Sequence, residues 1–147
     1  PRGLVTSDRS FQSTDATAGT SLYRLAAGTY TLSVAGRGDV VGEYRLRVLD
    51  LSDAAPVTIG AETSGTLRPS RETDVYRFEA TAGDSLFFDA ISSAGGSTTW
   101  RLLDPFGRTV FGPDSFGDVE AAPLEVGGFY TLLVEGGISP GFGGDFS

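Results

Sequence analysis

The chain has 147 residues, with 11 basic and 19 acidic side chains and a net charge of −8. It contains no histidine, cysteine or lysine, which excludes a Ser-His-Asp triad, a cysteine nucleophile, a conventional zinc site, a Schiff-base lysine and a P-loop lysine. The negative charge argues against nucleic acid and anionic membrane as partners, and no apolar stretch is long enough for membrane insertion.

Short alternating segments bounded by turn residues predict β-strands throughout the chain. Glycine is abundant, at 21 residues, and threonine, valine and aromatic residues fill most of the segments between glycines, which favours strands joined by tight turns. No segment has a helical stripe of apolar residues. The strands are expected at residues 28–35, 42–50, 74–79, 85–90, 98–103, 108–111 and 128–135, with another starting at Phe146.

Two of the connections have the composition of hairpin turns. Residues 81–84 read T-A-G-D and residues 104–107 read D-P-F-G, with glycine where a positive φ is easily adopted and proline where a turn is favoured. Strands separated by such turns at intervals of about ten residues are typical of all-β folds. We therefore expect an antiparallel β-sandwich of jelly-roll-like form.

The chain repeats itself at an interval of 100 to 104 residues. Residues 25–36 match residues 124–136 with one extra residue in the second copy, so that Tyr30 corresponds to Tyr130. A repeat of this length is a whole domain and not a solenoid rung. Two shorter matches agree, between residues 1–5 and 105–110 and between residues 42–44 and 144–146.

The repetition predicts one and a half tandem modules. Residues 1–53 would be the C-terminal half of one β-sandwich, and residues 54–147 a second one that lacks most of its final strand. The junction is expected at residues 54–56, which read A-A-P. Because a half-module would expose the apolar faces of its strands, something outside residues 1–51 must cover them.

Several motifs resemble those of the bacterial pre-peptidase C-terminal domain. They are a D-x-Y-x-F strand at residues 74–78, an A-G-D-x-L hairpin at 82–86, a turn formed by Leu103, Asp104 and Gly107, and a G-x-Y-x-L-x-V strand at 28–34 and again at 128–134. The resemblance covers nearly the whole chain. It implies a jelly-roll-like sandwich, appended to secreted peptidases or strung in tandem in surface proteins, that is non-catalytic and in some members binds calcium or collagen.

Candidate sites in the sequence are few. Asp114 and Asp118, in a glycine-containing loop, are the candidate calcium ligands; a solvated turn is the alternative, and no other cofactor is expected. Trp100 and the neighbouring aromatic residues fit core packing better than a ligand platform, although Phe87 and Phe88 must point to opposite faces. Nothing in the spacing of the acids selects a pair for glycoside hydrolysis. Arg45 and Arg47 are expected on a solvated strand face.

These observations favour a structural role over an enzymatic one. The first hypothesis is a non-catalytic repeat of an extracellular bacterial or archaeal fibre or surface protein, whose partners are copies of itself or neighbouring modules joined through β-strand edges. The alternative is an accessory domain that binds an extracellular polymer or matrix for a secreted peptidase or other hydrolase. Both place the chain outside the cell or at the cell surface.

Overall fold

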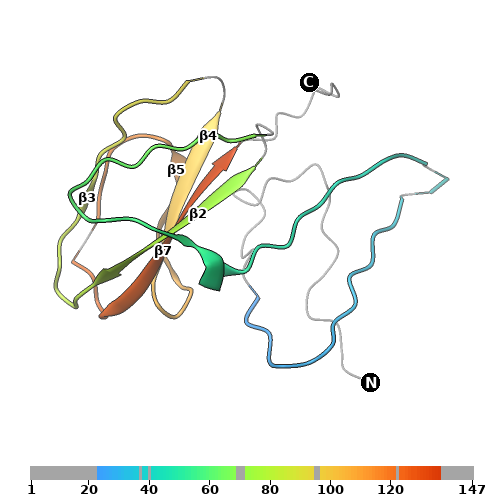
Figure 1. Cartoon of the computed structure of the whole chain (residues 1–147), viewed down its shortest axis with the longest axis horizontal. Helices are drawn as coiled ribbons and strands as arrows, with labels where there is room; N and C mark the ends of the chain where they lie inside the picture. Colours follow the sequence, from blue (N-terminus) through green and yellow to red (C-terminus); the bar gives the residue numbers. More distant parts are fainter. Residues whose placement is uncertain are drawn as a thin grey trace.

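The computed structural model describes residues 23–36, 38–39, 41–68, 72–94, 97–121 and 123–136. Within these residues the fold is all-β, and the only helical turn is the 3-10 segment η1 (Leu51–Asp53). The strands form two sheets, both made by residues after position 54 (Figure 1). We call the described residues from 51 to 136 the β-sheet unit, and those from 23 to 50 the arm.

The larger sheet has five strands in the order β1-β2-β7-β4-β5. Its centre is β7 (Gly128–Gly136), which pairs antiparallel along β2 (Thr73–Ala80) on one side and β4 (Thr98–Leu103) on the other. The edges are the short strand β1 (Ala55–Pro56), parallel to β2, and β5 (Thr109–Ser115), antiparallel to β4. The strand that the repeat duplicates therefore lies in the middle of the sheet.

The smaller sheet consists of β3 (Phe87–Phe88) and β6 (Val119–Glu120). It packs on the larger sheet through Phe88, whose ring lies 6.1 Å from Phe78, 5.0 Å from Phe111 and 6.1 Å from Trp100, measured between centroids. Phe87, the next residue, is exposed. The two side chains therefore face opposite ways, as alternation along a strand requires.

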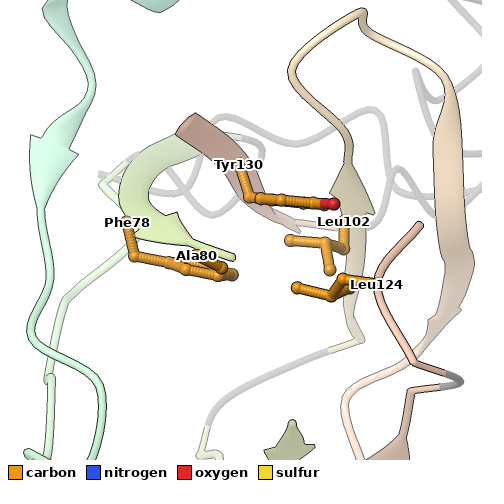
Figure 2. Packing of buried hydrophobic residues seen from close by; sticks show 5 residues of the cluster. All are labelled: Phe78, Ala80, Leu102, Leu124 and Tyr130. Atoms are coloured by element: carbon orange, nitrogen blue, oxygen red, sulfur yellow. The ribbon is translucent and has the colours of Figure 1, made fainter. Parts of the chain in front are cut away.

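The larger sheet and the loop before β7 form one hydrophobic core, against which Phe88 of the smaller sheet packs. Five buried side chains from β2, β4, β7 and the loop before β7 converge in it (Figure 2). The ring of Tyr130 stacks on that of Phe78, with centroids 5.7 Å apart and planes tilted by 10°. The five are Phe78, Ala80, Leu102, Leu124 and Tyr130.

The two predicted turns have the expected chemistry. Gly83 and Gly107 adopt φ values of +92° and +77°, in the left-handed region that glycine occupies without steric cost. At the second turn, Asp104 accepts hydrogen bonds from the backbone N–H groups of Phe106 and Arg108, both 2.8 Å, and from Arg108 Nε at 2.6 Å. The aspartate thus fixes the hairpin between β4 and β5.

Several predicted strands are confirmed and others are not. The expectations for residues 74–79, 98–103 and 128–135 correspond to β2, β4 and β7, whereas residues 85–90 yield only the two residues of β3 and β5 runs four residues past the expected end. The prediction of strands at 28–35 and 42–50 is wrong for the chain as described, since no described residue of the arm belongs to a ladder. An extended segment counts as a strand only when another strand pairs with it, and the described residues offer none. Phe146 and residues 1–22 lie outside the described residues.

Candidate functional site: an exposed repeat of strand β7

The arm is an extended segment whose described residues are all exposed. In Figure 1 it forms a wide blue-to-teal loop that extends to one side of the β-sheet unit and joins it through η1. Two arginines fasten it to the unit: Arg24 donates a hydrogen bond to the carbonyl oxygen of Pro105 (3.2 Å), and Arg47 forms an ion pair with Glu72. The arm is therefore attached by side chains at its two ends and not by a backbone ladder.

The arm reproduces a local structure of β7 as well as its sequence. In the β-sheet unit, the hydroxyl of Tyr130 donates a hydrogen bond to the carbonyl oxygen of Val126, four residues earlier, at 2.6 Å. In the arm, the hydroxyl of Tyr30 donates one to the carbonyl oxygen of Ala26, also four residues earlier, at 2.8 Å. The equivalent tyrosine thus fixes the residues that precede the strand in both copies, although only the β7 copy lies in a sheet.

The surroundings of the two copies differ sharply. Tyr130 is 1% exposed, because it pairs with β2 and Phe78 covers its ring. Its counterpart Tyr30 is 46% exposed, and the next residue on the same face, Leu32, is 68% exposed. The arm therefore displays to solvent the apolar face that β7 buries.

Glu72 is the electrostatic anchor of the arm. Its carboxylate accepts a hydrogen bond from the backbone N–H of Arg68 (2.8 Å) and is paired with Arg47. These two contacts, the backbone one first, lower the pKa of Glu72 below its ordinary value. Nothing in the sequence indicates this pair, because its partners lie 25 residues apart.

The outer edge of β2 is only partly covered by β1. Ala55 and Pro56 pair with Tyr76 and Arg77, and Val57 N–H donates to the carbonyl oxygen of Arg77 at 2.9 Å. No described strand pairs with the outer edge of β2 at residues 73–75. An edge of this kind can add a strand from another chain.

A buried ion pair distinguishes β7 from the arm. Arg101 Nη2 lies 2.8 Å from Glu135 Oε1, and both side chains are almost fully buried. They belong to the face opposite Tyr130, where the arm has Ala35 in place of Glu135. Sequence reasoning missed this pair: the acid in one of two otherwise similar strands marks Glu135 as unusual but does not indicate Arg101, 34 residues away, as its partner.

The structure does not gather the calcium candidates into a metal site. Asp114 lies on β5 and is exposed, whereas Asp118 accepts a hydrogen bond from the backbone N–H of Ala90 at 3.0 Å. Among the described residues no group of three or more acidic side chains is placed to hold a metal ion. Asp118 thus joins the loop after β3 to the loop before β6.

The aromatic residues divide between core and surface. Trp100 is buried against Phe111 and Phe116, with ring centroids 5.9 and 4.6 Å away. Phe106 and Phe129 are exposed, and each lies under an arginine, Arg108 at 5.7 Å and Arg77 at 5.6 Å. The prediction that Trp100 packs in the core is confirmed. Arg47 is exposed as expected, but so are Leu46 and Val48 on the other face of the arm.

Comparison with known proteins identifies no relative: no family model, no curated protein and no solved structure matches the chain. In the part of the chain that the structure describes, no helix has the length and apolar character needed to span a membrane.

Proposed function

We propose that this chain is a non-catalytic structural repeat of an extracellular fibre or surface protein, which assembles by pairing the edges of its β-strands. One observation carries the proposal: the arm repeats the sequence and the tyrosine hydrogen bond of a central strand, yet its apolar face is exposed. A monomer gains nothing from exposing that face, because burial of apolar surface is the main favourable term in folding. Such a segment is suited to pairing with strands outside the described residues.

The proposal includes a tandem arrangement of β-sandwich modules. The contacts of Phe88 with Phe78, Trp100 and Phe111 bring the small sheet onto the large one, as in two-layer β folds. The match between residues 25–36 and 124–136 then makes the arm part of a second such module. A resemblance to the pre-peptidase C-terminal domain fits this reading, as motifs at 74–78 and 82–86 form β2 and the following turn.

Residue chemistry supports a non-catalytic role. The sequence has no histidine, cysteine or lysine, which leaves carboxylates, hydroxyls and arginine as the only reactive side chains. Hydrogen bonds lower the pKa of every described carboxylate whose pKa is shifted, namely Asp50, Glu72 and Asp104. A general acid needs the opposite shift.

Assembly of the purified chain tests the proposal. Samples at increasing concentration would be followed by light scattering and imaged by electron microscopy, with Thr31→Pro and Thr31→Val as matched variants. Proline removes the backbone N–H that a strand ladder requires, whereas valine keeps it. We expect filaments from the unaltered chain and from Thr31→Val, and a loss of filaments in Thr31→Pro. Dispersed particles at every concentration, or equal assembly by both variants, would contradict the proposal.

A second candidate function is a polymer-binding accessory domain of a secreted hydrolase. The exposed rings of Phe87, Phe106 and Phe129 favour it, because aromatic rings offer large contact areas to a polymer. Cosedimentation with collagen or insoluble polysaccharide tests it, with alanine replacing each ring in turn. Retention of the chain that drops in these variants would favour the accessory role, and no retention on any polymer would leave the structural repeat.

A further inference from the structure

We infer that the arm is the central strand of a second sheet, and that its binding partner is a further copy of residues 54–104, which supplies a β2-type strand to one edge and a β4-type strand to the other. This inference rests on the proposed function and names the occupant of its exposed segment. It is carried by a comparison of the arm with the environment of β7.

The register of β7 defines where each partner strand would lie. In the β-sheet unit Tyr130 is opposite Phe78 of β2, and Leu132 is opposite Tyr76 of β2 and Leu102 of β4. Residues 28–36 align with 128–136 without a gap. Tyr30 would therefore face a Phe78-type residue, and Leu32 would lie between a Tyr76-type and a Leu102-type residue.

The composition of the core shows which side chains the arm lacks. Of the five residues in the core cluster, Leu124 and Tyr130 have counterparts in the arm, Leu25 and Tyr30. Both counterparts are exposed. The three others come from β2 and β4, at Phe78, Ala80 and Leu102. The arm thus carries the portion of a core that β7 and its preceding loop contribute, and residues 54–104 carry the complementary portion.

The two faces of the arm differ in polarity, as expected of a strand that pairs along both edges and packs on one face only. Tyr30, Leu32 and Val34 are apolar and alternate with Thr31, Ser33 and Ala35, which are small or weakly polar. The second set tolerates solvent once the strand is paired, so the partner needs to cover one face only. In β7 the corresponding face holds Leu133 and Glu135, both buried, where the arm has Ser33 and Ala35.

A fusion protein tests the inference directly. An additional copy of residues 54–104 would be joined ahead of Pro1, so that Pro1 follows the added aspartate as Pro105 follows Asp104 in the chain. Amide hydrogen exchange of residues 28–36 would then be compared in the fusion and in the unextended chain. We expect exchange to slow by at least about 100-fold, because paired central strands open only in large unfolding events. Unchanged exchange would overturn the inference.

Two variants of the fusion separate specific pairing from general compaction. Leu32→Asp places a charge on the face that must be buried and is expected to abolish the protection. Thr29→Arg places a charge on the opposite face, where the counterpart Phe129 is exposed and lies opposite Glu79 of β2, and is expected to keep the protection. Protection that survives Leu32→Asp would also overturn the inference. If the fusion is insoluble, a soluble domain joined ahead of the added copy allows the same exchange measurement, with the same two outcomes.

The result is distinguishable from a failure of the proposed function. Protection in the fusion without filaments from the intact protein would support the pairing and reject the fibre. Filaments from the intact protein without protection in the fusion would reject the pairing alone.

Discussion

Tyr130 and Tyr30 make the same hydrogen bond in different surroundings, which allows one substitution to be tested against an internal control. Tyr130→Phe removes the bond to the Val126 carbonyl oxygen in the core. The expected loss is about 0.5–1.5 kcal/mol in the free energy of unfolding, or a fall in Tm of roughly 4–8 °C for each kcal/mol in a unit of this size. Tyr130→Ala also leaves a cavity beside Phe78, and about 3–5 kcal/mol is expected for loss of a buried aromatic ring.

The same changes at Tyr30 are expected to alter the free energy of unfolding by less than about 0.5 kcal/mol, because its ring is largely exposed and water replaces its hydrogen bond. Urea unfolding followed by the fluorescence of Trp100 is a suitable assay. This is the only tryptophan in the chain, and it is 4% exposed within the core. Equal losses at the two tyrosines would contradict this expectation, because they would mean that the arm is packed as tightly as β7.

Three further predictions concern the β-sheet unit. Gly112→Ala is expected to cost several times more stability than Gly83→Ala. Both glycines have a positive φ, but a Cβ at Gly112 would meet the carbonyl oxygen of Trp100, whereas a Cβ at Gly83 would meet open space. Thermal unfolding of the two variants gives the comparison. Arg101→Leu is expected to lower the free energy of unfolding, measured with denaturant, by about 3–5 kcal/mol, because it leaves the buried carboxylate of Glu135 unpaired. Combining it with Glu135→Leu should recover much of that loss. A double variant as unstable as the single one would contradict this expectation. Burial alone would raise the pKa of Asp104, but hydrogen bonds from the backbone and side chain of Arg108 and the backbone of Phe106 outweigh it and lower that pKa. Its stabilising contribution is therefore present above the unfolded-state value of about 3.9 and lost as the pH falls through the lower folded-state value. Asp104→Asn should flatten the dependence of stability on pH in that acidic range and destabilise the unit by about 1.5–3 kcal/mol at pH 7; an unchanged acid profile would count against this role.

The parts of the fold that could be predicted from the sequence are those where local pattern and tertiary pairing agree. β4 and β7 alternate apolar residues over six or more positions and are bounded by turn residues, and both form where expected. The segment at 85–90 has a similar composition, but only Phe87 and Phe88 find a partner, in the two residues of β6. Strand length here is set by the partner and not by the segment itself.

The arm marks the limit of pattern reasoning most clearly. Its residues 28–35 alternate as well as those of β7, and the sequence predicts a strand at both places. Ladder formation depends on the neighbouring strands, and β7 has β2 and β4 whereas the arm has no strand partner among the described residues. Pairwise contacts between distant residues, such as Arg47 with Glu72 and Arg101 with Glu135, were beyond prediction for a related reason. Each depends on a three-dimensional placement that no local spacing encodes.

Electron microscopy of the intact protein from its native source tests the central claim most directly. We expect regular filaments whose density repeats on the scale of one β-sandwich, with strands pairing between successive modules at a segment with the sequence of residues 28–36. Dispersed particles with no repeating density would contradict the structural role and leave the polymer-binding accessory domain as the better reading.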